Sequence, residues 1–228
     1  MKNHAILLLI CLLFANGLLG QGSYFLANEV LLYDFAYLSP AGDTVAKGEI
    51  VITPTNEKWE HDASQKRVMY EYIFAHRDAK YFTKGLHGRP IENEQMETTG
   101  YNEGDRFFWT HPFRANIFYI TQVAPFPEYV KGNGKVKVKN TLVIDKGWGK
   151  FAGTSKSNYK MSAHSKELPG FEGHKLKKVD MRSKHPLGKS CLSMIVADEI
   201  GILKMDYKFF NKDRLFVSLV KKGDRRFR

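Results

Sequence analysis

The histidines are the residues that would most readily hold a catalytic metal, but their spacing does not favour such a site. No H-E-x-x-H motif is present, and no two histidines are spaced as paired metal ligands. His61 lies between Glu60 and Asp62 in a stretch typical of a solvent-exposed turn. We therefore expect no metal site and no cofactor at the histidines that follow the leader: His61, His76, His87, His111, His164, His174 and His185.

Carboxylates gather in the segment from residue 86 to 105, which has no sustained apolar periodicity and is predicted to be a long loop. Their spacing matches no calcium-binding loop, and a glycosidase pair is defined by a separation in space. We expect solvated loop acids here. The acids concerned are Glu92, Glu94, Glu97, Glu103 and Asp105.

Nucleophile and nucleotide motifs are not found either. The segment 153–156 (GTSK) lacks the second glycine of a serine-hydrolase elbow, and 147–149 (GWG) lacks the spacing of a phosphate-binding loop. Cys191 lies in a strand-like stretch and is predicted to pack as a small apolar group. Whether the protein is an enzyme stays open, with a non-enzymatic role favoured.

Lysines form the clearest polar pattern. In the segment 135–139 (KVKVK), period-two geometry sends the lysines to one face of a strand and Val136 and Val138 to the other, toward the core. A second cluster follows at 175–178 (KLKK), and the two would form one positive surface if their strands were neighbours. The alternative is a solvated outer face. The candidate anionic-partner residues are Lys135, Lys137, Lys139, Lys175, Lys177 and Lys178.

The first 20 residues have the layout of a signal peptide. Lys2 precedes an apolar run from Ala5 to Ala15, and small residues at Gly17 and Gly20 follow it. The run is shorter than the roughly 20 residues that a membrane-spanning helix needs. We expect the mature chain to begin between residues 18 and 22, to keep no transmembrane helix, and to form a single β-rich domain over residues 21–228.

The whole chain has a formal net charge of +11, and processing removes Cys11, which leaves Cys191 without a disulfide partner. Basic charge on an exported protein favours acidic partners of the cell envelope, and export argues against nucleic acid. The expected location is the periplasm or the cell exterior, with outer-membrane association left open.

Apolar residues recur with a period of two along most of the remaining sequence, which predicts strands. Tyr33, Phe35 and Tyr37 share one face of the first segment, and the turn at 39–43 joins it to a second at 45–53. We expect an all-β antiparallel meander of about ten strands, curled into an open or closed barrel, with a two-sheet sandwich as the alternative. The further predicted strands cover 68–74, 81–82, 106–111, 116–123, 135–145, 157–163, 175–182, 189–196, 201–210 and 214–220.

The half of the chain from about residue 115 to 221 resembles a group of uncharacterised, exported, β-rich proteins of Gram-negative bacteria, some assigned to domains of unknown function. The features that carry the resemblance are the segment 124–127 (APFP), Trp148-Gly149, and the terminal hairpin that opens at 201–207 (GILKMDY). It implies a curved antiparallel sheet or a partial barrel. The group has no agreed activity, so no residue inherits a catalytic role.

Three functional hypotheses follow. The first is a binding protein whose curved sheet holds an apolar or amphiphilic ligand on its concave side, or that meets an anionic envelope component. The second is an envelope carbohydrate or lipid hydrolase, which would need two close carboxylates, or a histidine with a carboxylate, in a cleft. The third is an outer-membrane barrel, against which the basic C-terminal residues 225–228 and the many charged strand positions argue.

Overall fold

The computed structural model describes residues 24–26, 28–78, 80, 94–114, 118–132 and 136–226. The predicted signal peptide and the strand expected at 81–82 lie outside these residues. Two short 3-10 helices, η1 (Tyr119–Val123) and η2 (Lys146–Phe151), interrupt an otherwise all-β chain. The strands are β1 (Leu31–Leu38), β2 (Thr44–Trp59), β3 (Asp62–Arg77), β4 (Glu94–Glu103), β5 (Phe107–Thr110), β6 (Glu128–Val130), β7 (Lys137–Ile144), β8 (Gly153–Ala163), β9 (Leu176–His185), β10 (Gly188–Ala197), β11 (Gly201–Lys208), β12 (Arg214–Lys222) and β13 (Arg225–Arg226).

All of these strands belong to one antiparallel sheet, ordered β6-β5-β4-β3-β2-β1-β12-β11-β10-β9-β8-β7, with β13 added to β12. The chain starts in the middle of the sheet, moves strand by strand to the edge at β6, crosses to the other edge at β7 and returns to β12 beside β1. The two edges share no ladder, so the sheet is an open meander and not a closed barrel. The predicted fold class is confirmed.

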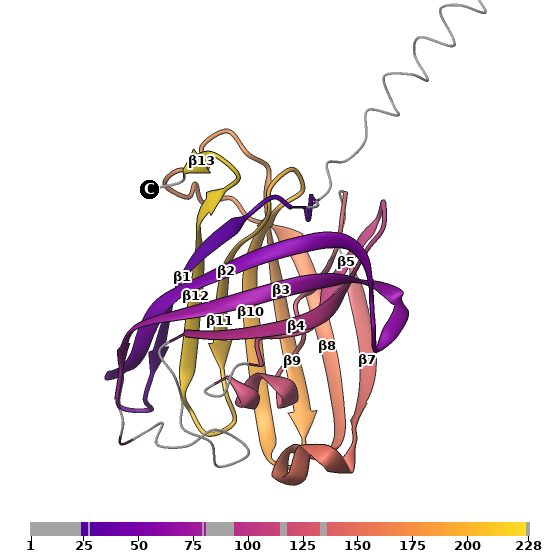
Figure 1. Ribbon diagram of the computed structural model, residues 1–228, viewed down its shortest axis with the longest axis vertical. Coiled ribbons are helices and arrows are strands. Elements are labelled where there is room, and N and C mark those ends of the chain that lie inside the picture. Colours follow the sequence, from indigo (N-terminus) through magenta and orange to yellow (C-terminus); the bar gives the residue numbers. More distant parts are fainter. Residues whose placement is uncertain are drawn as a thin grey trace, which may run out of the picture.

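The sheet twists so strongly that its two halves face each other. Figure 1 shows β1 to β4 running obliquely across the front of the upright strands β8 to β12. This crossing is also compatible with the sandwich alternative, because the two halves cover a common core as two packed sheets do. Right-handed strand twist accumulated over many strands is the physical origin of such folding over.

The core lies between these halves and is rich in aromatic rings. Tyr33, Phe35 and Tyr37 are buried on one face of β1, as their period-two spacing predicts. Val68, Tyr70, Tyr72 and Phe74 of β3 are buried in the same way. At this core, a void lined by Tyr24, Phe25, Ile52 and neighbouring side chains measures about 10 Å³, which is no more than a water molecule requires.

Two predictions about the middle of the chain are wrong. Residues 94–103, expected in a loop, form β4, and residues 119–123, expected in a strand, form η1. β4 lacks an apolar alternation because two of its inward positions carry carboxylates, Glu97 and Glu103, that find hydrogen-bond donors inside the protein. In η1 the Thr121 N–H donates to the Phe118 carbonyl, a local bond that replaces strand pairing just before Pro125.

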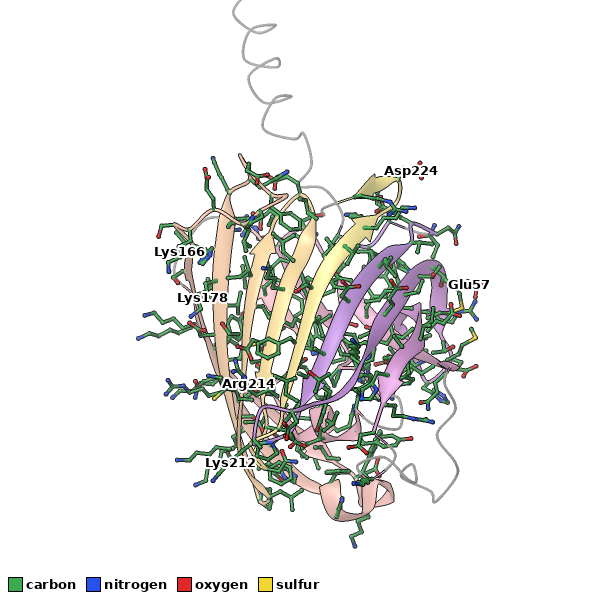
Figure 2. The ribbon with its side chains drawn as sticks, turned by 90° about the vertical axis from the view of Figure 1, so that its left-hand side faces the viewer. Glu57, Lys166, Lys178, Lys212, Arg214 and Asp224 are labelled. Carbon is green, nitrogen blue, oxygen red and sulfur yellow. The ribbon has the colours of Figure 1, made fainter. Side chains whose placement is uncertain are left out.

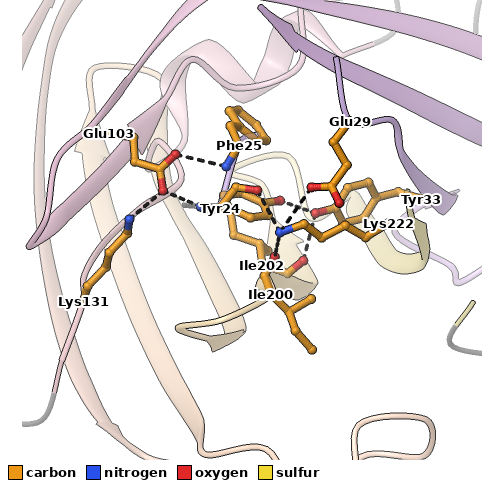
Figure 3. Close-up of polar contacts among 9 residues, drawn as sticks. All are labelled: Tyr24, Phe25, Glu29, Tyr33, Glu103, Lys131, Ile200, Ile202 and Lys222. Atoms are coloured by element: carbon orange, nitrogen blue, oxygen red, sulfur yellow. Dashed lines mark hydrogen bonds and ion pairs between the residues drawn. The ribbon is translucent and has the colours of Figure 1, made fainter. Parts of the chain in front are cut away.

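The segment that follows the predicted signal peptide is anchored by buried charges (Figure 3). Glu103 Oε1 accepts the backbone N–H of Tyr24 at 2.5 Å, and Oε2 accepts that of Phe25 at 3.0 Å. Lys131 Nζ lies 2.6 Å from Glu103 Oε1, and the two side chains are 2% and 5% exposed. Because each charge is paired and hydrogen-bonded, this cluster can be buried at the end of the core.

A lysine from the other end of the chain completes this anchor. Lys222 Nζ donates to the carbonyl oxygens of Tyr24 at 3.0 Å and Ile200 at 3.3 Å, and lies 3.6 Å from Glu29 Oε2. Gly201 is required here: a Cβ on its backbone would lie 1.6 Å from the Tyr24 ring, and its φ of +105° suits glycine. The N-terminal segment and the β11–β12 end of the sheet are therefore fixed to each other.

Candidate functional site

The outer face of β7 to β12 is strongly basic, and we call it the basic face. Its lysine and arginine side chains occupy the positions that alternate with buried residues, so they point away from the core. In Figure 2 such nitrogen-tipped side chains project to the left of these strands, with Lys178 and Arg214 labelled. The basic face comprises Lys137, Lys139, Lys156, Lys160, Lys178, Arg182, Lys184, Lys189, Lys204, Lys208 and Arg214.

Several of these lysines stand directly opposite one another across neighbouring strands. Lys137 of β7 pairs in register with Lys160 of β8. Lys184 of β9 lies between Lys156 of β8 and Lys189 of β10, which pair with it on either side. Like charges in such positions are destabilising, by some tenths of a kcal/mol per pair. The basic face thus holds positive charges that local pairing does not balance.

The two acids on this face are already engaged. Asp180 lies 3.0 Å from Lys178 Nζ, and Asp206 lies 2.8 Å from Arg214 Nη2. For the exposed lysines of the basic face, by contrast, the described residues provide no carboxylate within ion-pair distance. A surface trough of about 680 Å³ crosses the face, lined by basic side chains from Lys160 to Lys208 together with Asp180, Asp206, Ser193 and Cys191.

The structure places the six predicted lysines differently from one another. Lys137 and Lys139 are exposed on β7, while Val136 and Val138 are half-buried against the core. Lys178 shares their outer face, although β8 separates its strand β9 from β7. Lys175 is exposed just before β9. Lys135 lies outside the described residues.

Lys177 does not belong to the basic face. Its side chain is 8% exposed, and its Nζ lies 2.5 Å from Asp198 Oδ2. The backbone N–H of Gly132 donates to the same carboxylate at 2.9 Å. Strict alternation along a strand requires that one of the adjacent Lys177 and Lys178 points inward, but the sequence alone does not distinguish which of the two.

Most residues of the basic face were not predicted from the sequence, although the sequence contains a pattern that indicates them. Lysines alternate with buried positions at 156–160 (KSNYK) and 204–208 (KMDYK), as they do at 135–139. Cys191, predicted to pack as a small apolar group, is a free thiol that lies half-buried on the outer side of β10 at the trough.

The predicted loop acids also lie elsewhere than expected. Glu97 points into the protein, where Tyr72 Oη donates to its Oε1 at 2.6 Å and the Arg114 N–H donates at 3.0 Å. Burial raises the pKa of Glu97 to about 7. Glu103 is buried as described above, Asp105 is exposed in a turn, and Glu92 lies outside the described residues.

Within the described ranges, no group of three or more His, Cys, Asp or Glu side chains is arranged to hold a metal ion. His111 is partly buried beside Trp59 and Trp109, and burial lowers its pKa to about 4. No helix in the part of the chain that the structure describes is long and apolar enough to cross a membrane.

No protein-family model matches the chain, and no curated protein matches it. Among solved structures, it is similar to a protein of Bacteroides fragilis described as exported with a YmcC-like fold, at 12% identity over 87% of this chain and 96% of that one, with a TM-score of 0.37. It is also similar to a protein of Parabacteroides distasonis described as a lipoprotein, at 8% identity over 87% and 97% of the two chains, with a TM-score of 0.41. Both descriptions agree with the resemblance to exported proteins, and at these scores neither decides what this chain does.

Proposed function

We propose that the protein is an exported, non-enzymatic binding protein that docks on anionic polysaccharide of the cell envelope through its basic face. The observation that supports this most is the row of Lys156, Lys184 and Lys189, which face one another across three strands and have no carboxylate within ion-pair distance among the described residues. Such a surface carries a repulsion that an anionic partner would relieve.

The shape of the face favours an extended chain as the partner. The positive side chains are distributed over strands from β7 to β12, and the trough runs between them. A flexible polymer with a carboxylate on successive units can contact several of these side chains at once. Its binding would be electrostatic, and salt would weaken it because the Debye length falls from about 10 Å at 0.1 M to about 3 Å at 1 M.

The test compares two sets of charge-neutralising substitutions. Lys156→Gln, Lys160→Gln and Lys184→Gln together remove three exposed charges of the basic face, and Lys47→Gln, Lys58→Gln and Lys66→Gln remove three exposed charges of β2 and β3. Binding to soluble polygalacturonate is measured by calorimetry at low and high salt. We expect at least a tenfold loss of affinity for the first set and little change for the second.

Three results would overturn the proposal. An equal loss in both sets would mean that only net charge matters, and no binding of the wild-type protein at low salt would mean that the face is solvated surface. Tighter binding to vesicles of anionic phospholipid than to the polymer would assign the face to a membrane surface instead.

A further inference from the structure

The two edges of the open sheet meet through side chains instead of a ladder. Asn140 of β7 donates from its Nδ2 to Glu128 Oε1 of β6 at 2.6 Å. Glu128 pairs in register with Trp109 of β5, so both lie on the face opposite to Phe108 and Tyr129, which are buried in the core. A space lies beside this Glu128–Asn140 contact, between the edge strands.

That space is a crevice of about 230 Å³ whose lining is partly apolar and partly polar. The apolar part of the lining includes the Trp109 and Phe126 rings, whose centroids are 6.0 Å apart with an interplanar angle of 34°. Ligand pockets for drug-sized molecules measure roughly 300–1,000 Å³, so this crevice suits one small ring. Its lining is completed by Ala124, Leu142, Glu128, Asn140, Thr141, Ser155 and Ser157.

The polar groups of the lining have hydrogen-bonding capacity to offer a ligand. Glu128 is 4% exposed, and the bond from Asn140 is the one hydrogen bond that the described residues give its carboxyl group. The hydroxyl group of Ser155, also 4% exposed, belongs to the same lining. Burial raises the pKa of Glu128 to about 7, so near neutral pH its carboxyl group can either donate or accept a hydrogen bond.

The chemistry of the lining excludes several classes of ligand. A wholly apolar ligand would cover the Glu128 carboxyl and the Ser155 hydroxyl without offering either of them a hydrogen bond, which is unfavourable. An anion would meet the Glu128 carboxylate, which would repel it. A neutral ring with one apolar face and several hydroxyl groups satisfies both parts of the lining.

We propose that the crevice between β6 and β7 binds a single uncharged sugar ring. The C–H face of the ring packs against Trp109 and Phe126, and its hydroxyl groups hydrogen-bond to Glu128, Asn140 and Ser155. This site is separate from the basic face, because its ligand carries no charge and its affinity is expected to be insensitive to salt. Either proposal can therefore fail without the other.

Ligand-observed NMR provides the test, with the full-length mature protein and a panel of neutral monosaccharides: glucose, galactose, mannose and N-acetylglucosamine. We expect saturation transfer to at least one sugar, with an affinity that stays the same between 0.1 and 1 M salt. Trp109→Ala should abolish the transfer, and Glu128→Gln should weaken binding about tenfold. Trp148→Ala, which alters a ring packed on Tyr119 outside the crevice lining, is the matched control and should bind as wild type does.

Ser157→Leu keeps the test decisive if Trp109→Ala fails to fold. Ser157 is a half-buried residue of the lining, and a leucine there would occupy the crevice without deleting a wall. Loss of sugar binding in a folded Ser157→Leu protein would support the site. The proposal is overturned if no sugar of the panel binds the wild-type protein at millimolar concentration, or if binding survives both Glu128→Gln and Ser157→Leu.

Discussion

The two halves of the sheet use their charged residues in opposite ways. In β7 to β12 the charges lie mainly outside, where lysines form the basic face. In β1 to β6 several charges lie inside, where Glu103 meets Lys131 and Glu97 meets Tyr72. The outer face of β1 to β4 is mixed, with Asp34, Glu49 and Glu71 beside Lys47 and Arg67 and with Met96 73% exposed.

This difference shows that the position of a charge, more than its number, decides its effect. An exposed lysine keeps its water and can be replaced at little cost to folding. A buried carboxylate must have partners, so each one fixes the elements around it. Buried charges therefore stabilise the first half of the sheet, whereas exposed charges make the second half available to a charged partner.

The largest effect is expected from breaking the buried pair in the first half. Glu103→Ala leaves the Lys131 ammonium buried and the N–H groups of Tyr24 and Phe25 unbonded, so we expect a loss of about 3–5 kcal/mol in the free energy of unfolding. Urea unfolding measures it, with Asp105→Ala in the adjacent turn as the control. A loss no greater than that of the control would show that the buried pair does not stabilise this half.

A charge placed on the inner side of the second half should have the next largest effect. Val138 packs against the core, and Val138→Lys should reduce the free energy of unfolding by about 1–3 kcal/mol because an ammonium group would lose water there. Lys139→Gln, one residue further and exposed, should change it by less than about 0.5 kcal/mol. Thermal and urea unfolding of both variants measure the two effects. If Lys139→Gln proved the more destabilising, Lys139 and not Val138 would face the core.

Buried carboxyls should also make stability depend on pH. The pKa of Glu128 rises from its usual 4.5 to about 7 on folding, so the native state binds this proton more tightly than the unfolded chain. Stability from this group is fully present below about pH 4.5 and is lost as the pH rises through 7. Glu128→Gln should therefore gain stability relative to wild type between pH 5 and 8, by roughly 1–3 kcal/mol.

Urea unfolding of both proteins at several pH values measures that gain. His111 provides a comparison of opposite sign, because burial lowers its pKa to about 4 and its contribution is lost as the pH falls below about 6.5. His111→Gln should therefore approach or exceed wild-type stability only in acid. A difference between Glu128→Gln and wild type that stays constant with pH would contradict the assignment.

The smallest effect concerns the lysines that face each other. Lys184→Gln removes a charge opposite both Lys156 and Lys189, so it should raise the free energy of unfolding by some tenths of a kcal/mol at low salt. Lys139→Gln is the matched variant, because Lys139 faces Asn158 and should be neutral. Chemical unfolding at 20 mM and 500 mM salt should show the gain shrinking with salt, and a gain equal in both variants would contradict the pairing argument.

Much of the fold could be predicted because aromatic and aliphatic residues recur with a period of two along the sequence of β1, β3 and β8 to β12. β4 could not be predicted in this way, since its inward residues include Glu97 and Glu103, whose partners Tyr72 and Lys131 are distant in sequence. The crevice could not be predicted from the sequence either. Phe126 lies between two prolines, and nothing near Glu128 in the sequence indicates that Asn140 and Ser155 are its neighbours.

The sequence by itself determined that the chain is a basic antiparallel meander with lysines on the solvent-facing side of its strands. This follows from local geometry, because alternate side chains of a strand must point to opposite faces. Only the tertiary structure decided that Lys177 is buried against Asp198, that the sheet stays open, and that Glu128 and Asn140 meet at its edges. These features depend on how far the sheet twists before its ends approach each other, and that twist is a property of all the strands together.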